Sequence, residues 1–465
     1  MDFSAINSLV KALEAGSYNA APSTLVQGAA LQVENLSPVL QNVTFDDSHL
    51  KLQQMLSVKS CKSMLVQFDR QLSYGHVGGS AQLEGHVGQE ATSDFVRVVV
   101  PMCFYSHTRR VTIASTMIDT VDGKKSDERA ASDAAKKIAF DVEYDLFRGR
   151  ADFSNAGVFD GNPLTLPSLM ANMMGVDVQV RQSDVLRNAR DLMFAEYGSD
   201  DSIIISGGGT LTQEMVEDAS VRSAMNMGNA DKLVVDPKVL SNYNKIALGK
   251  ERIILAGSPQ EGTGSDLRKQ WVSGGTVSVE ASRFLSGKTA VRSSLPNGPV
   301  APTVVATPAA ISGATTTFTA GQVYIYFATS ENEIGESPAS ATSTATIVTA
   351  GHGVNVVITH GSGTNRFFNV YRTAAGGAAA TAKFIGRVLT AAGASTTTFV
   401  DIGNKLPGFV TGFLIQRDTM EINELAPYSR LKLAQTELSL PESHFRFLTL
   451  AVFQPRKNCI IDNLR

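Results

Sequence analysis

Cysteine is scarce in this sequence, and long apolar runs are absent. Three cysteines, Cys61, Cys103 and Cys459, occur among 465 residues, with no CxxC pair. Such a sparse, odd set excludes a disulfide framework and a zinc site, and it fits reduced thiols in a cytoplasm. No apolar run reaches the ~20 residues that span a bilayer, and the acidic Asp2 stands where a signal peptide carries basic residues. We therefore expect a protein made inside the cell, with no membrane segment.

An excess of charge of one sign is lacking as well. Lys and Arg number 41, Asp and Glu number 44, and the formal net charge is −3. This balance excludes bulk charge as the basis of nucleic-acid or membrane binding. The chain is 43% hydrophobic and 18% charged, so it has ample material for sizeable cores, and its length suggests about two to four domains.

Catalytic and metal-binding motifs are missing too. The seven histidines form no HExxH pair, and no serine lies in a GxSxG elbow. Gly287-Lys288-Thr289 resembles the end of a P-loop, but Ser282 stands where its first glycine is required. Gly207-Gly208-Gly209, between a predicted strand and a predicted helix, is interpreted as a plain flexible connection. We predict no enzyme, no catalytic residue, no metal and no cofactor.

Residues 64–113 show strand periodicity in two stretches, which predicts a long β-hairpin. Met64, Val66 and Phe68 share one face, with polar residues on the other, and a second strand pattern starts at Asp94. Between them Gly-His-Val-Gly occurs twice, so the tip is rich in glycine and carries His76 and His86, interpreted as a solvated pair rather than a metal site or pH sensor. A hairpin of this length is not stable alone and requires another surface to cover it. Residues 1–63, polar and weakly periodic, are predicted to form an arm.

Residues 114–299 mix helices and strands, which indicates an α+β or α/β body. The clearest helix covers residues 126–150, with Ser126 as its predicted N-cap and Gly149 as its stop. Alanines at three- and four-residue spacing let this helix lie close against a sheet. Further helices are predicted at 184–197 and 211–225, and short buried strands at 203–205, 233–235 and 253–255.

The composition changes near Pro296. Residues 300–407 are dominated by Ala, Thr, Ser, Gly and Val, and charged residues become rare. Regularly spaced strand patterns without helix signals predict a small antiparallel β-sandwich, inserted between prolines. Its predicted strands are 323–328, 344–348, 354–359, 367–371, 384–388 and 396–400. Residues 408–465 return to the earlier style, and 444–453 are apolar on both strand faces, which predicts a central strand.

Several stretches carry a resemblance to a known family. They are Leu211-Thr212-Gln213-Glu214, Lys232 to Pro237, Glu424 to Pro427, Phe445 to Phe453 and Asp462-Asn463. Together with the order of the predicted elements, they resemble the major capsid proteins of tailed bacteriophages with the Hong Kong 97 fold. The resemblance implies an α+β fold with an N-terminal arm (1–63), an E-loop hairpin (64–113), a spine helix with peripheral and axial segments (114–299), and C-terminal strands (408–465) that complete the core. The insertion resembles a fibronectin type III or immunoglobulin-like module through Tyr324-Ile325-Tyr326, residues 330–338 and Phe368 to Arg372.

The resemblance also implies a function and partners. The chain would be the structural subunit of an icosahedral virion capsid, assembled in the host bacterial cytoplasm as hexamers and pentamers around double-stranded DNA that it does not bind specifically. Portal, scaffold and cement or decoration proteins would be its further partners, and the inserted module would project outward. The E-loop has no lysine between Lys62 and Lys124, so isopeptide cross-links from it are excluded. The residues implied in contacts with a neighbouring subunit are Tyr74, Gly75, His76, Gly78, Gly79, Gly85, His86, Gly88, Arg109 and Arg110.

Three alternatives remain open. An encapsulin-like nanocompartment shell shares the fold but normally lacks an immunoglobulin-like insertion. A phage tail or fibre protein would carry the sandwich, but it fits the long helix and the mixed middle poorly. A glycan-binding adhesin or a hydrolase would need aromatic platforms with paired carboxylates, and aromatic residues make up only 7% of the chain.

Overall fold

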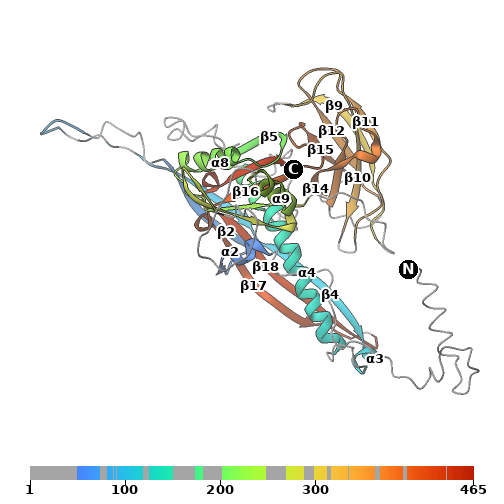
Figure 1. The fold of residues 1–465 in the computed structure, drawn as a ribbon. Helices are drawn as coiled ribbons and strands as arrows, with labels where there is room; N and C mark the ends of the chain where they lie inside the picture. The colour runs from blue at the N-terminus through green and yellow to red at the C-terminus, as the bar shows by residue number, and fades with distance from the viewer. Residues whose placement is uncertain are drawn as a thin grey trace, which may run out of the picture.

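The computed structural model describes residues 50–73, 81–86, 88, 90, 92–118, 125–149, 173–181, 202–247, 269–286, 298–311, 316–332, 335–361, 367–390, 395–435 and 437–465. Figure 1 shows an elongated body of helices and strands, a separate β-sandwich beside it, and a narrow ribbon that projects from the body. The predicted α+β class with an all-β insertion is confirmed. The predicted helix at 184–197 and strand at 253–255 lie outside the described residues.

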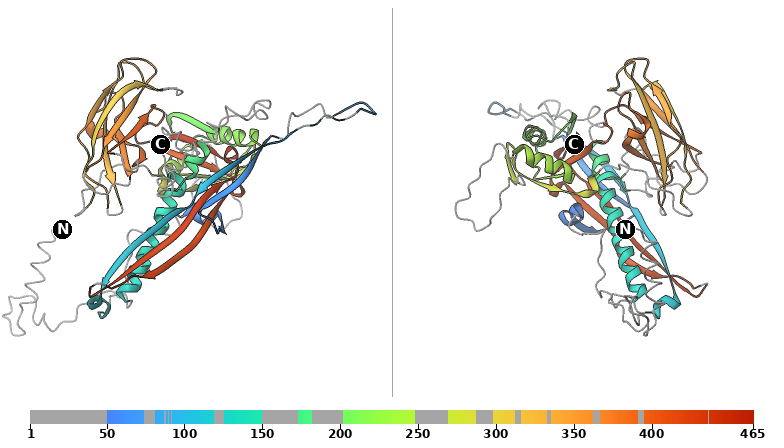
Figure 2. Two further views of the ribbon diagram at one scale, coloured as in Figure 1. Left: turned by 180° about the vertical axis from the view of Figure 1, so that it is seen from behind. Right: turned by 45° about the vertical axis from the view of Figure 1, so that its right-hand side comes forward.

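A four-stranded sheet and one long helix make the elongated half of the body. The sheet has the order β1 (Ser57–Ser60), β17 (Met420–Lys432), β18 (Ser439–Val452) and β4 (Cys103–Thr112), with only β1 and β17 parallel. β18 is central, as its apolar residues predict. The helix α4 (Ser126–Arg148) lies along one face of the sheet (Figure 2), and its apolar stripe shares a core with Leu448 and Leu450.

The ends of α4 show one prediction confirmed and one corrected. Gly149 ends the helix, and a Cβ at this position would meet the Met173 carbonyl oxygen at 2.1 Å, so only glycine fits. The N-cap is Lys125, which makes no side-chain cap hydrogen bond, and not Ser126. The Ser126 hydroxyl instead donates to the carbonyl of Ser115 at 2.9 Å, which ties the helix to the short helix α3 (Ile113–Thr116).

A six-stranded mixed sheet makes the other half of the body. Its order is β5 (Ile203–Gly209), β19 (Cys459–Leu464), β16 (Val410–Ile415), β6 (Lys232–Val235), β8 (Gly275–Ala281) and β7 (Lys269–Val272). The helices α8 (Gln213–Met225) and α9 (Pro237–Ala247) cover one face, where Val216 and Tyr243 pack with Val277. On the other face, residues such as Phe413 join the core beneath α4.

The glycine triplet before α8 was interpreted wrongly as a connection, because Gly207 to Gly209 form the end of β5. The helix begins two residues later than the predicted Leu211. Its N-cap is Thr212, whose hydroxyl accepts the backbone N–H of Met215 at 3.2 Å. The remaining short elements are α2 (Lys51–Met55), η4 (Arg283–Leu285), η5 (Ala379–Thr381), η6 (Arg417–Thr419) and η7 (Pro455–Lys457).

The insertion is a sandwich of two antiparallel sheets, with each predicted strand within two or three residues of its observed bounds. One sheet has the order β11 (Ser343–Thr346), β10 (Val323–Glu331), β13 (Phe367–Arg372), β14 (Lys383–Leu389), and the other β15 (Thr396–Asp401), β12 (His352–Thr359), β9 (Thr303–Ala310). β9 was missed by the sequence patterns. The sandwich has its own aliphatic and aromatic core, crossed by a buried ion pair between Arg372 and Asp401 at 2.5 Å.

The chain order within the sandwich differs from that of an immunoglobulin constant domain. There the first two strands share a sheet. Here β9 and β10 lie in different sheets, and β9 pairs with β12 while β10 pairs with β13. The insertion therefore shares the two-sheet architecture of immunoglobulin-like modules, and closer kinship stays a prediction.

The projecting ribbon consists of β2 (Leu65–Ser73) and β3 (Asp94–Pro101), paired antiparallel. The predicted hairpin boundary at residue 113 is corrected by the structure, because the chain leaves the ribbon at Met102. There the backbone N–H of Met102 donates to the carbonyl of Met64, and the next strand, β4, joins the four-stranded sheet.

Candidate functional site

The base of the β2–β3 ribbon is fixed to the body. Phe68 packs edge-on against Phe453, with ring centroids 4.9 Å apart. The guanidinium of Arg70 donates to the carbonyls of Phe453 and Val452 at 2.8 and 2.6 Å. Burial lowers the pKa of Arg70 to about 10. A charged side chain is thus half-buried against backbone carbonyls, which holds the ribbon at the angle at which it leaves the body.

The other face of the ribbon is uncovered. Phe95 is 64% exposed, Val99 is partly exposed beside it, and Leu83 near the tip is 85% exposed. Asp69 and Arg97 pair across the strands at 2.9 Å on this face, and the hydrogen bond from Arg97 lowers the pKa of Asp69. A two-stranded ribbon that is covered on one face only is marginally stable in water. The exposed apolar side chains on its other face therefore indicate a contact with another molecule.

The predicted contact residues at the tip are only partly within the described residues. Tyr74, Gly75, His76, Gly78 and Gly79 lie outside them, so the interpretation of His76 and His86 as a solvated pair is not tested.

The rest of the tip shows one glycine with a conformational role. Gly85 adopts φ +85°, and the turn closes through the His86 N–H and the Leu83 carbonyl at 3.1 Å, so a residue other than glycine would be strained there. Around Gly88 the space is open, and a Cβ would meet nothing within 4 Å.

Arg109 and Arg110 do not belong to the ribbon, which corrects their predicted place in the E-loop. Both lie in β4, where Arg109 pairs in register with Glu442 of β18 and Arg110 with Pro441. Arg110 forms an exposed ion pair with Glu437 at 3.3 Å. Strand-forming residues continue from β3 into β4, so the predicted hairpin extends past the break at Met102.

A second uncovered apolar surface, not predicted from the sequence, lies at the far end of the four-stranded sheet. Here β4 ends, β17 ends and β18 begins, as the lower part of Figure 1 shows. The exposed apolar side chains at this end are Met117, Ile118, Leu431, Leu433 and Leu438. Five large aliphatic side chains at one end of a sheet are a recognised mark of an interaction surface.

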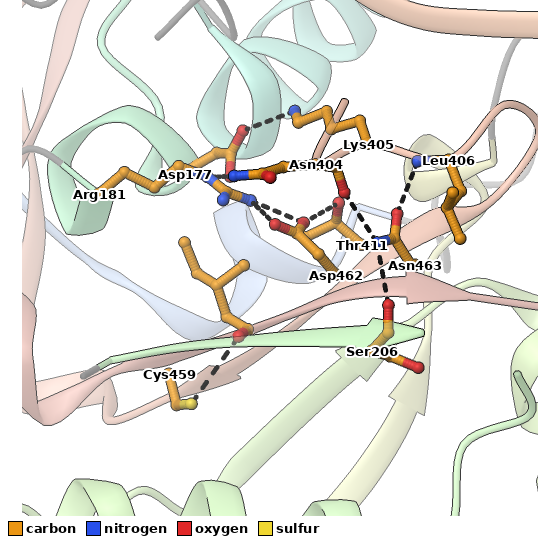
Figure 3. Close-up of polar contacts among 11 residues, drawn as sticks. Asp177, Arg181, Ser206, Asn404, Lys405, Leu406, Thr411, Cys459, Asp462 and Asn463 are labelled. Carbon is orange, nitrogen blue, oxygen red and sulfur yellow. Dashed lines mark hydrogen bonds and ion pairs between the residues drawn. The ribbon is translucent and has the colours of Figure 1, made fainter. Parts of the chain in front are cut away.

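Buried charges hold the exit of the sandwich against the body (Figure 3). Arg181 donates to Asp177 at 2.9 Å and to Asp462 of β19 at 2.6 Å, and Lys405 lies 3.8 Å from Asp177. Burial disfavours the Asp462 carboxylate, yet the attraction of Arg181 and Lys405 keeps its pKa below its usual range.

Asn463 completes this junction. It adopts a left-handed φ of 62°, accepts the Leu406 N–H at 2.8 Å, and donates to the carbonyls of Asn404 and Ser206 at 2.8 and 3.1 Å. A single side chain therefore joins the exit of the sandwich to strand β5 of the six-stranded sheet.

A second contact fixes the sandwich to the spine helix. The guanidinium of Arg387 lies 4.8 Å from the ring of Tyr144 in α4 and 4.7 Å from that of Phe367, and it pairs with Glu331 at 2.7 Å. The sandwich is thus attached through β14 as well as through its exit, and it is held in one orientation rather than tethered.

A cluster of metal ligands is not found in the described part of the chain. No three His, Cys, Asp or Glu side chains there gather in a way that could hold a metal ion. Gly287-Lys288-Thr289 lies outside that part. Among the helices described, none is both long and apolar enough to cross a membrane.

Comparison with known proteins gives a consistent result. No family model matches the chain. The chain is similar to the major capsid protein of Staphylococcus phage S25-3, with 23% identity over 475 residues that cover 98% of this chain and 95% of the relative. The major capsid protein of Staphylococcus phage K matches with the same identity and coverage. The similarity therefore spans the insertion as well as the body.

Solved structures to which the chain is similar include two capsid chains. A chain of the cyanophage A-1(L) capsid has a TM-score of 0.48 at 10% identity, covering 94% of this chain and 98% of that chain. A chain from the capsid of a native GTA particle has a TM-score of 0.43 at 11% identity, covering 97% of this chain and 100% of that chain.

Proposed function

We infer that the chain belongs to the major capsid proteins of tailed phages with the Hong Kong 97 fold, and that it is a structural subunit of the capsid. The observation that carries this conclusion is the collinear match to phage major capsid proteins over 98% of the chain. The arrangement of ribbon, spine helix and two sheets agrees with it. As a capsid protein, the chain acts as a homo-oligomer in the virion.

The ribbon is the part of the fold through which we propose that subunits join. The contacts at the base of the ribbon fix its direction. Its exposed apolar side chains, Phe95, Val99 and Leu83, are available for contact with a neighbouring subunit. Each subunit would both extend a ribbon and receive one, and such heterologous contacts close into rings. We propose hexamers and pentamers on this basis, with the glycine-rich tip adapting to the two angles.

The finer parts of the proposal follow from the same fold. The sandwich projects from the shell surface in a fixed orientation, supported by the contacts of Arg387 and Lys405 with the body. The shell encloses double-stranded DNA without specific binding, because the chain lacks a basic excess. Portal, scaffold and decoration proteins complete the proposal as partners, with assembly in the host bacterial cytoplasm and no enzymatic activity.

Deletion of residues 74–89 tests the role of the ribbon. The subunit should stay folded, because these residues lie beyond the contacts of Phe68 and Arg70 with the body. Assembly should be lost. We would co-express the chain with its neighbouring genes and examine the product by sedimentation and negative-stain electron microscopy.

A matched pair of substitutions distinguishes a specific role of the ribbon in assembly from a general effect of exposed apolar side chains. Leu83→Ser changes an 85% exposed side chain near the ribbon tip, and Val348→Ser changes an 81% exposed one on the sandwich. Only Leu83→Ser should reduce assembly. Normal particles from the deletion variant would contradict the proposed role of the ribbon.

The alternatives are less well supported. The full-length relatives are phage capsid proteins, which does not favour a nanocompartment shell or a tail protein. An adhesin or hydrolase would remain a monomer near 49.5 kDa even with its neighbours present, which the same sedimentation experiment detects.

A further inference from the structure

The sole tryptophan of the chain is almost fully exposed. Trp271 lies on β7, the edge strand of the six-stranded sheet, with 86% of its surface open to solvent. A tryptophan normally buries about 150–250 Å² in a core or an interface. Tryptophan is also among the residues that dominate the energetics of protein interfaces.

The register of β7 and β8 shows which way Trp271 points. Gln270 lies beside Val277, which is buried beneath α8 and α9, and Gln270 accepts a hydrogen bond from Tyr243 of α9. Trp271 alternates to the opposite face, beside the exposed Thr276. Trp271 therefore faces away from α8 and α9, at an end of the sheet that no other described residue covers.

Lys269 shares this face, because it is two residues from Trp271 on the same strand. It is exposed and forms no ion pair with any residue in the described ranges. Trp271 and Lys269 together form what we call the edge patch: one large ring and one positive charge.

A complementary surface lies on the solvent side of α8. Glu214, Asp218, Val221 and Met225 are spaced by four, three and four residues, so they form one stripe along the helix. Glu214, Asp218 and Met225 are exposed, and the two carboxylates have no ion-pair partner among the residues that the structure describes. The stripe combines negative charge with a polarisable thioether.

Met227, just beyond the helix, extends this stripe in an unusual way. Its φ is 58°, in the left-handed region where glycine is the favoured residue, and its side chain is 63% exposed. This conformation belongs to the cap that ends α8, in which the backbone N–H groups of Met227 and Gly228 donate to the carbonyls of Ala224 and Ser223 at 2.9 and 2.8 Å. The cap leaves the thioether of Met227 open to solvent beside the end of the stripe. We call Glu214, Asp218, Met225 and Met227 the helix patch.

The two patches lie on opposite faces of the six-stranded sheet, because Trp271 points away from the layer that α8 occupies. They cannot meet within one subunit, but two copies arranged head to tail bring them together. We propose that the edge patch of one subunit docks on the helix patch of the next copy, with the Trp271 ring against the methionine sulfurs and Lys269 facing Asp218. The inference rests on the proposed function, since it assigns a second contact between copies, separate from the ribbon. Sulfur–aromatic contact and opposite charge supply the complementarity.

The first test uses Trp271 as its own reporter. On assembly of the wild-type chain, its fluorescence should shift to shorter wavelength and become shielded from acrylamide. Particles in which Trp271 stays fully quenchable would overturn the inference while leaving the proposed function intact. A wild-type chain that remains a monomer beside its neighbouring proteins would overturn the proposed function and this inference with it.

Variants provide the second test. Trp271→Ala should weaken assembly roughly tenfold or more, whereas the equally exposed Val348→Ala should not. Met227→Gly should keep or raise the thermal midpoint of the subunit, because it relieves the left-handed strain, and yet should reduce assembly. A general folding defect would lower both, so that combination contradicts the proposal.

Charge reversal tests whether Lys269 of the edge patch faces Asp218 of the helix patch. Lys269→Glu alone should impair assembly, and adding Asp218→Lys should restore it. All these positions are exposed, so the circular dichroism of the subunit should remain that of the wild type. Failure of the double variant to recover any assembly would contradict the facing of Lys269 and Asp218.

Discussion

The β2–β3 ribbon and the β9–β15 sandwich are both built of short antiparallel strands, yet they differ in what covers them. The two sheets of the sandwich cover each other, and their inner residues form a core that includes Tyr326, Phe368 and Ile358. The ribbon has one sheet only. Its inner face meets the body through a small cluster around Val100, Met174 and Val178, and its outer face meets nothing described.

This difference shows that an alternating pattern predicts a strand but not the partner of its faces. Within the sandwich, the apolar residues of the alternating pattern are covered by the opposite sheet of the same chain. In the ribbon, Phe95 stays exposed, and the proposed contact with a second subunit would cover it. The following predictions sharpen this contrast, from the largest expected effect to the smallest.

Arg372→Met should destabilise the sandwich by about 3–5 kcal/mol, because it leaves Asp401 as a buried charge without its ion-pair partner. The Tyr326 hydroxyl, which donates to Asp401 at 3.0 Å, cannot replace a positive charge. Urea unfolding of the full chain, followed by limited proteolysis to locate the opened region, would measure this. A change below 1 kcal/mol would show that the sandwich does not depend on its ion pair.

Much of this architecture could be read from the sequence, and the failures have physical causes. The strands around Tyr326, Val356 and Val370 are predicted because short runs of aromatic and β-branched residues there are separated by turn residues. Strand β9 was missed because Pro308 and the alanines beside it resemble a linker. β9 is the edge strand of its sheet, where proline is tolerated.

The candidate site was less predictable than the fold. The sequence located the ribbon but not its end, because strand-forming residues continue through Met102 into a strand of another sheet. Arg109 and Arg110 were therefore assigned to the wrong element. The exposed end of the four-stranded sheet and the orientation of Trp271 depend on which residues remain uncovered after packing, and no local pattern records that.

Phe68→Ala should loosen the base of the ribbon by about 1–2 kcal/mol, less than a fully buried phenylalanine because Phe68 is half-buried. Hydrogen exchange should accelerate in β2 and β3 and remain unchanged in the sandwich. Equal acceleration of exchange in the ribbon and in the sandwich would show that the two regions unfold together.

Asp462→Asn should remove part of the acid sensitivity of the junction between sandwich and body. The pKa of Asp462 is lower in the fold than its usual value of about 3.9, so its contribution to stability is present above that pH and is lost as the pH falls through the lower folded value. The wild type should therefore lose stability more steeply than the variant below pH ~4. Urea midpoints of both proteins between about pH 6 and about pH 3 would show this difference, and parallel curves for the two proteins would contradict it.

Arg97→Gln should have the smallest effect, with no measurable change in the thermal midpoint of the isolated subunit. Its ion pair with Asp69 lies on the exposed face of the ribbon, where water and salt screen the attraction. A clear loss of stability would mean that this face is already covered within one subunit.

The place of β19 in the chain has a consequence for synthesis. This strand lies between β5 and β16, and it pairs Ile460 with Ile203, so β5 has no neighbour on that side until the ribosome has delivered residues 459–464. The sandwich, made earlier, carries its whole core within 303–401 and can fold while translation continues. A nascent chain would thus display a finished module on an unfinished body.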